Sequence, residues 1–133
     1  MRFHRAPVWI LAVVLFAFVS SAAMVVPQAK HDLQVTARKY AYTVSGTQGS
    51  EIRVRKDDLV TITFSTADIP HSFTIGDDHY RIDRRAESGK PVTFRFRADK
   101  AGEFEIRCTL TVDERCLREM RGKLIVAAPG GPH

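Results

Sequence analysis

Two short segments of the chain carry side chains that are able to bind a soft metal ion. His71 lies in the segment Asp-Ile-Pro-His-Ser, and Cys108, Cys116 and Met120 follow in the pattern Cys-x7-Cys-x3-Met. Imidazole, thiolate and thioether are the ligand types that select copper over harder metals. If folding brings these four side chains together, the sequence predicts a site for one copper ion.

The same two cysteines also permit an interpretation without a metal. Cys108 and Cys116 are the only cysteines of the chain, and paired thiols outside the cytoplasm tend to oxidise. A disulfide that closes this short loop would stabilise the fold by roughly 2–3 kcal/mol on a chain-entropy estimate. His71 would then be a hydrogen-bonding residue that fixes the Pro70 turn, and Met120 would be a packing residue of the core. The sequence leaves both interpretations open.

The elements that must position these residues are β-strands. Apolar and polar residues alternate with a period of two in several stretches, which is typical of half-buried strands. The stretches are 33–37, 52–54, 60–64, 92–97 and 104–108, with further short strands expected at 40–44 and 124–126. The only helical candidate is a turn or two across 112–121. Seven or eight short strands separated by turn residues predict an antiparallel sandwich or barrel.

The strand pattern places the candidate ligands at strand ends. Cys108 follows Phe104 and Ile106 in the alternation, so its sulfur is expected to point toward the core. His71 follows Pro70, just before a strand expected to start at Ser72. The sequence therefore predicts that these residues meet at one end of the sandwich.

Other polar residues near these segments are expected to stay outside the site. His79 lies in the turn-forming segment Gly-Asp-Asp-His-Tyr, where a solvated histidine is commoner than a metal ligand. Asp113 and Glu114 are adjacent in the loop between the cysteines, which indicates a solvated turn.

The N-terminal segment predicts export. Arg2 and Arg5 precede an uncharged, largely apolar run, and small residues follow at 20–23. This order is typical of a secretory signal peptide covering residues 1–23. The alternative is an uncleaved membrane anchor over 6–27, close to the ~20 residues that span a bilayer. In both cases the domain expected at 30–127 is periplasmic or otherwise extracytoplasmic, and it meets the membrane only through an uncleaved N-terminal segment. Residues 128–133 are expected to form a loose tail.

Charge and motif content exclude several functions. The net charge is +5, and the excess is diffuse, with some concentration over 81–97. No supporting motif accompanies these basic residues, so nucleic-acid binding is not expected, whereas an anionic surface on a redox partner would suit them. The chain has no nucleophile elbow, zinc-protease motif, phosphate-binding loop or dinucleotide fingerprint. A non-enzymatic role is therefore expected.

Residues 51–126 resemble a cupredoxin domain, and they are most similar to the copper-binding domain of cytochrome c oxidase subunit II. The family pattern D-[IV]-x-H-S-F-x-I matches 68–75, which read D-I-P-H-S-F-T-I. The pattern [AP]-G-x-[FY]-x-x-x-C matches 101–108, and M-x-G-x-[IL]-x-V matches 120–126. The resemblance implies an all-β fold, a cupredoxin-like Greek-key β-sandwich.

The resemblance is incomplete at the metal. The binuclear loop of the oxidase subunit reads C-x-E-x-C-x3-H-x2-M, but Leu110 and Val112 stand where the Glu and the second Cys would fall, and no His lies between residues 108 and 120. A binuclear centre is therefore not expected. A mononuclear blue site takes two His, one Cys and a weak axial Met, and here Cys116 stands in place of the second His.

The resemblance thus implies one copper ion held by four residues, with a role in electron transfer or copper handling. The implied ligands are His71, Cys108, Cys116 and Met120. Thiolate and thioether prefer Cu(I), so this set shifts the expectation toward copper handling. The implied partner is a redox protein or a copper donor or acceptor. The alternative is a metal-free structural or interaction module with a Cys108–Cys116 disulfide.

Overall fold

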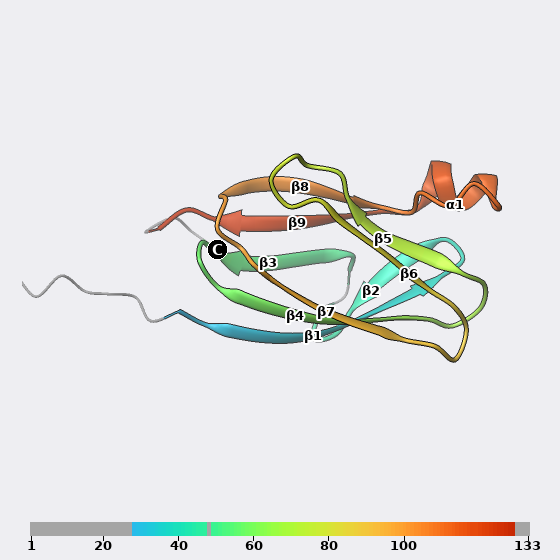
Figure 1. Ribbon diagram of the computed structural model, residues 1–133, viewed down its shortest axis with the longest axis horizontal. Coiled ribbons are helices and arrows are strands. Elements are labelled where there is room, and N and C mark those ends of the chain that lie inside the picture. The colour runs from blue at the N-terminus through green and yellow to red at the C-terminus, as the bar shows by residue number, and fades with distance from the viewer. Residues whose placement is uncertain (1–27, 48, 130–133) are drawn as a thin grey trace, which may run out of the picture.

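The described part of the chain forms strands and one short helix. The computed structural model describes residues 28–47 and 49–129 (Figure 1). Its elements are β1 (Lys30–Arg38), β2 (Ala41–Val44), β3 (Glu51–Arg55), β4 (Leu59–Thr66), β5 (His71–Ile75), β6 (Ile82–Ala86), β7 (Val92–Arg97), β8 (Gly102–Arg107), α1 (Glu114–Glu119) and β9 (Arg121–Ala127). Within these residues, no helix has the length and apolar character needed to cross a membrane. The signal or anchor expected in 1–27 and most of the expected tail lie outside the described residues.

The strands form two sheets that pack face to face. One sheet has the order β2-β1-β4-β7 and the other the order β3-β9-β8-β5-β6. The chain crosses between the sheets several times, and this confirms the predicted sandwich (Figure 1). Two pairs, β1 with β4 and β3 with β9, are parallel rather than antiparallel as predicted. Period-two alternation tells which face of a strand is buried, but it carries no information about the direction of the neighbouring strand.

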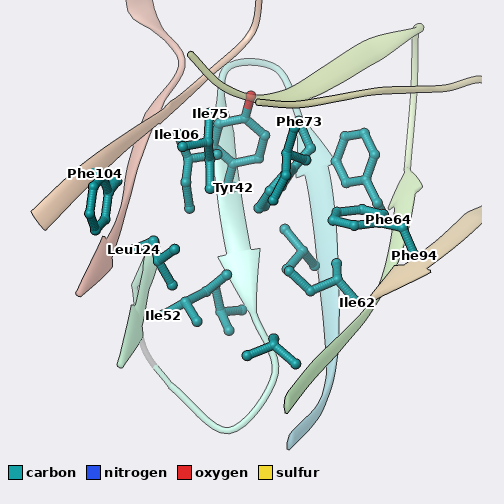
Figure 2. Packing of buried hydrophobic residues seen from close by; sticks show 14 of the residues in the cluster. Tyr42, Ile52, Ile62, Phe64, Phe73, Ile75, Phe94, Phe104, Ile106 and Leu124 are labelled. Atoms are coloured by element: carbon teal, nitrogen blue, oxygen red, sulfur yellow. The ribbon is translucent and has the colours of Figure 1, made fainter. Parts of the chain in front are cut away.

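Aromatic rings fill the centre of the sandwich (Figure 2). Tyr42, Phe64, Phe73 and Phe94 form a chain of ring contacts with centroid separations between 5.3 and 6.3 Å. Such tilted and edge-to-face pairs add to the stabilisation from burial alone. Because the rings come from both sheets, they hold the sheets in a fixed relation and give the strand ends a rigid support.

β6 was not predicted from the sequence. Only its first and last residues, Ile82 and Ala86, are buried, and the three residues between them are exposed. β6 is an edge strand, and the Arg84 guanidinium covers the Phe94 ring with 5.2 Å between Cζ and the ring centroid. Three consecutive exposed residues break the alternation of buried and exposed positions, so the sequence carries no period-two signal for this strand.

The segment that follows β8 carries both cysteines. β8 ends at Arg107, and Cys108 comes next. α1 begins after Asp113, whose side chain accepts a hydrogen bond from the Arg115 N–H and so caps the helix. The chain then returns along β9, where a Cβ at Gly122 would lie 2.7 Å from the Ser50 carbonyl oxygen. Only glycine permits this close approach without a shift of the backbone.

Candidate metal centre

The structure brings three of the four predicted ligands together. The ligand atoms of His71, Cys108 and Cys116 lie within 4.8 Å of one another, and all three residues are fully buried. The shortest approach from the imidazole is His71 Nδ1 to Cys116 Sγ, at 3.5 Å. β5, which starts at His71, pairs with β8, which ends just before Cys108. The sheet therefore supplies two of the residues, and α1 supplies the third.

The two cysteines are joined in a disulfide. Cys108 and Cys116 are bonded through their sulfurs, with 5.5 Å between the two Cα atoms, a separation that is ordinary for a disulfide. The structure therefore describes the oxidised state. In this state neither sulfur is a thiolate, so thiolate ligation of a metal requires prior reduction of the bond.

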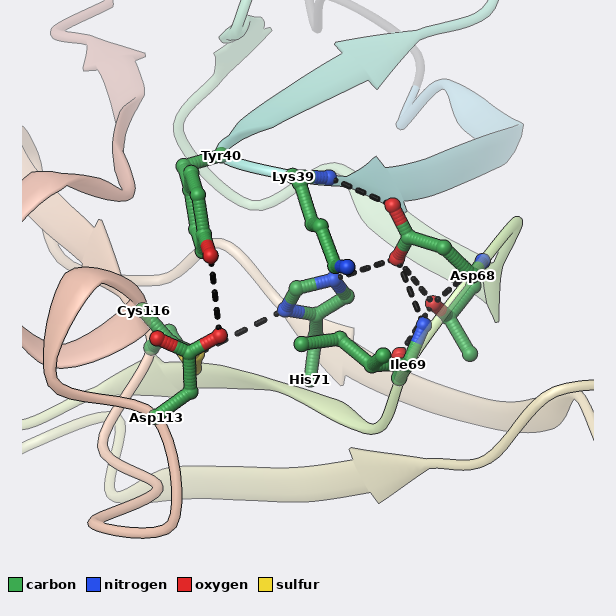
Figure 3. A network of polar contacts seen from close by, with 9 residues as sticks. Lys39, Tyr40, Asp68, Ile69, His71, Asp113 and Cys116 are labelled. Atoms are coloured by element: carbon green, nitrogen blue, oxygen red, sulfur yellow. Dashed lines mark hydrogen bonds and ion pairs between the residues drawn. A yellow bond between two sulfur atoms is a disulfide. The ribbon is translucent and has the colours of Figure 1, made fainter.

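Asp68 fixes the orientation of the His71 ring (Figure 3). His71 Nε2 lies 2.8 Å from Asp68 Oδ1, and the carboxylate also accepts hydrogen bonds from the backbone N–H groups of Lys39 and Ile69, at 2.8 and 2.7 Å. Burial opposes ionisation of Asp68, but these hydrogen bonds and the nearby imidazole outweigh it and lower its pKa to about 2. A carboxylate only accepts hydrogen bonds, so Nε2 carries a proton, and in a neutral imidazole Nδ1 then has the lone pair, 3.5 Å from Cys116 Sγ.

This donor set fits copper once the disulfide is open. An imidazole nitrogen and two sulfur atoms meet in the interior, where all three residues are fully buried. A carboxylate that holds the second ring nitrogen of a ligating histidine is the usual support of a metal-bound imidazole. Soft sulfur donors together with imidazole favour copper or zinc over harder ions. The disulfide state lacks the thiolates, so the fit applies to the dithiol state.

Met120 lies next to this cluster in the chain. It follows α1 directly, is fully buried, and forms part of the hydrophobic core. Packing alone would account for this burial. The assignment of Met120 as a ligand therefore stays a prediction.

A second polar network beside the site was not found from the sequence. The Tyr40 hydroxyl donates to Asp113 Oδ2 at 3.0 Å (Figure 3). The Arg115 guanidinium lies over the Tyr40 ring with 4.2 Å between Cζ and the centroid. Burial and the hydrogen bond to Asp113 both raise the pKa of Tyr40. Asp113, expected in a solvated turn, is instead the cap of α1 and the acceptor of this hydroxyl. The helix-start pattern of Asp followed by Glu was the available signal for the cap.

The other described histidines lie outside this cluster. His79 Nε2 contacts Asp99 Oδ1 on the surface, as expected for a turn histidine, and both side chains are 44% exposed. His31 pairs with Asp58 at the start of β1. Neither belongs to the group formed by His71 and the cysteines.

Comparisons with known proteins support the fold. No family model and no curated protein sequence matches the chain. Among solved structures, a chain of a heme-copper terminal oxidase dimer is 23% identical with a TM-score of 0.62. The match covers 74% of this chain and 65% of the oxidase chain, so this chain spans less than two thirds of the length of the oxidase chain. Subunit II of cytochrome c oxidase, solved as a mixed disulfide intermediate with a thioredoxin-like protein, is 18% identical with a TM-score of 0.60, covering 81% of this chain and 89% of that chain.

A small copper protein matches as well. Auracyanin A, a blue copper protein from Chloroflexus aurantiacus, is 19% identical with a TM-score of 0.55, and the match covers 74% of this chain and 99% of that chain. Identities at this level show a shared fold and leave function open. They agree with the two-sheet topology and with the three sequence patterns around His71, Cys108 and Met120. The described residues of this chain therefore have a cupredoxin-like fold.

Proposed function

We propose that this protein binds one copper ion when the Cys108–Cys116 disulfide is reduced. The proposed ligands are His71 Nδ1, the two cysteine thiolates and the Met120 thioether. The observation that carries the proposal is the arrangement at His71: Nδ1 has the sulfur of Cys116 as its partner, at 3.5 Å, and both side chains are fully buried. A histidine with only a structural role would satisfy both nitrogens with ordinary hydrogen bonds.

Copper handling is the role that this ligand set favours. Two thiolates and a thioether stabilise Cu(I) more than Cu(II), whereas an electron-transfer site must suit both. A bound copper ion would be either cargo or a one-electron centre. Asp68 would orient the imidazole, and the buried pocket would protect the thiolates from water. We propose no enzymatic activity for the chain.

Opening of the disulfide requires a dithiol reductant as a partner. A partner thiolate would attack one sulfur, and the other cysteine would leave as a thiolate. The second partner thiol would then resolve the mixed disulfide, so that this chain gains two electrons and two protons and the partner becomes a disulfide. A thioredoxin-like protein would suit this role, because one forms such an intermediate with the similar oxidase subunit. Export, as the N-terminal sequence predicts, would place both proteins outside the cytoplasm.

The disulfide itself favours a second candidate function. A permanent Cys108–Cys116 bond would make the chain a metal-free cupredoxin module with a structural or interaction role. In that case His71 and Asp68 would only stabilise the end of the sandwich.

A competition experiment separates the two candidates. The protein is reduced under anaerobic conditions and titrated with Cu(I) in the presence of a Cu(I) chelator, in parallel with a sample that keeps the disulfide. We expect the reduced sample to take one equivalent of Cu(I) from the chelator, and the oxidised sample to take none. The Cys108→Ser variant is the matched control, and it should lose most of the affinity. If the reduced wild-type protein does not compete, the metal-free module is the better description.

A further inference from the structure

The turn between β1 and β2 contacts both halves of the candidate site (Figure 3). The Lys39 N–H donates to Asp68 Oδ2 at 2.8 Å, and Asp68 holds the His71 ring. The hydroxyl of the next residue, Tyr40, donates to Asp113 Oδ2 at 3.0 Å. Asp113 caps the helix that carries Cys116. Two adjacent residues of one turn therefore connect the imidazole side of the site with the cysteine side.

This connection gains importance when the disulfide opens. In the oxidised state a covalent bond holds Cys116 against Cys108. After reduction this covalent link is gone, and the position of Cys116 depends on the noncovalent contacts of its loop and of α1, a helix of six residues. Helices this short are marginal on their own and depend on tertiary contacts. The position of Cys116 relative to His71 then depends on what still fastens the loop.

Tyr40 makes two polar contacts with the segment that carries Cys116. Besides the hydroxyl bond to Asp113, its ring lies under the Arg115 guanidinium at 4.2 Å. Arg115 is itself held in place, because its guanidinium donates to both carboxylate oxygens of Glu119 at 3.0–3.1 Å. Tyr40 thus contacts two residues at the start of α1, the cap Asp113 through a hydrogen bond and Arg115 through a cation–π contact.

We infer that Tyr40 is a positioning residue that keeps Cys116 beside His71 in the dithiol state. Through this contact Tyr40 raises the affinity of the site for Cu(I) and slows the reaction of the Cys116 thiol with external reagents. The first effect rests on the proposed function, and the second does not, because it needs only the dithiol state.

The Tyr40→Phe substitution isolates the hydroxyl, since it keeps the ring under Arg115. The matched control is Tyr80→Phe: the Tyr80 hydroxyl also donates one hydrogen bond, to the Lys100 carbonyl, and it accepts one from the Lys100 N–H. Tyr80 packs on Phe96 and Phe104, away from the site. Both variants are prepared as full chains, and their thermal unfolding in the oxidised state shows whether they fold. The same unfolding measurement on the reduced proteins shows whether the comparison is valid in the dithiol state.

Two measurements are made on the reduced proteins. The first is the rate of reaction of the metal-free thiols with Ellman's reagent, and the second is Cu(I) affinity by chelator competition. For Tyr40→Phe we expect the faster thiol phase to accelerate about five- to tenfold and the Cu(I) affinity to fall by a similar factor, the effect of losing one part-buried hydrogen bond of ordinary net strength. For Tyr80→Phe we expect both values to stay within about twofold of wild type, because its hydrogen bond contributes nothing to the site.

The two readouts keep the two proposals apart. Accelerated thiol reaction in Tyr40→Phe, with no Cu(I) binding by wild type, would support the positioning role and contradict the proposed function. Wild-type Cu(I) binding with unchanged thiol rate and unchanged affinity in Tyr40→Phe would overturn the positioning role alone. Equal acceleration in Tyr40→Phe and Tyr80→Phe would also overturn it, because the effect would then be a general loosening of the fold.

Discussion

Two histidine–aspartate pairs lie at opposite ends of the sandwich and differ in what the histidine faces. The His71–Asp68 pair lies at the end that carries α1, and the His31–Asp58 pair lies where the chain enters β1. The N···O distance is 2.8 Å in both pairs. The His71 side chain is fully buried and its other nitrogen faces Cys116, whereas the His31 side chain is 30% exposed.

The aspartates of the two pairs are held in the same way. Asp68 accepts backbone N–H groups from Lys39 and Ile69, and Asp58 accepts them from Ala29 and Arg55. Burial opposes ionisation of each carboxyl, but the hydrogen bonds outweigh it, so the pKa of each is lowered. Each pair therefore fastens a turn to a neighbouring strand. The comparison teaches that such a pair is a structural device by itself, and that sulfur donors at the second nitrogen make it a candidate metal site.

The sharpest test of this difference is the removal of each imidazole. His71→Ala should lower the Cu(I) affinity of the reduced protein by about 100-fold or more, because it removes a ligand rather than a supporting residue. His31→Ala should leave the affinity unchanged, since His31 faces no sulfur. Chelator competition measures both. A similar loss in the two variants would mean that the fold, and not the site, controls binding.

The disulfide at the α1 end predicts a second difference between the two ends of the sandwich. Replacing both cysteines, Cys108→Ala with Cys116→Ala, should lower the free energy of unfolding by roughly 2–3 kcal/mol, because the unfolded chain regains the freedom of the closed loop. Urea unfolding with and without a reductant measures this loss. Reductant should destabilise the wild type and leave the double variant unchanged; a wild type insensitive to reductant would contradict the prediction.

The carboxylates that hold the two histidines, Asp68 and Asp58, should differ less in their effect on Cu(I) affinity. Asp68→Asn should weaken Cu(I) binding by about 10- to 100-fold, the range for outer residues that orient a ligating histidine. Asp58→Asn is the matched control at the other end and should have no effect on the affinity. Calorimetric titration of the two reduced variants compares them directly. A loss confined to Asp58→Asn would be incompatible with the role given to Asp68.

Acid stability gives the smallest expected effect. The pKa of Asp68 is about 2 in the folded protein, against an ordinary value of 3.8. A lowered folded-state pKa means that the stabilisation is fully present above about pH 4 and is lost as the pH falls toward 2. After allowance for solvent screening, the contribution is about 1–2 kcal/mol. Unfolding of the oxidised, metal-free protein over pH 2–6 should therefore show a shallower acid slope in Asp68→Asn than in wild type, and identical slopes would rule out this contribution.

Local sequence patterns predicted the parts of the fold that depend on single strands. The alternation of Phe104, Ile106 and Cys108 correctly indicated that all three are buried. The helical candidate across 112–121 contains the observed α1. The cupredoxin patterns around residues 68–75 and 120–126 correctly indicated the sandwich, because they mark where the strands β5 and β9 begin.

The parts that depend on distant contacts could not be predicted. Tyr40 and Asp113 are 73 positions apart in the chain, and no spacing rule connects them. β6 lacks a buried face along most of its length because it is an edge strand, so its residues resemble a loop. The sequence does not determine the state of the cysteines, because two sulfurs that lie close together suit both a disulfide and a metal ion.

The central claim is that His71, Cys108 and Cys116 bind the same copper ion in the reduced protein. X-ray absorption at the copper edge of the Cu(I)-loaded, reduced chain tests it directly. We expect one copper per chain, with both sulfur and imidazole scattering in its first shell, and loss of the imidazole signal in His71→Ala. A first shell without imidazole in the wild type, or an unchanged first shell in His71→Ala, would contradict it.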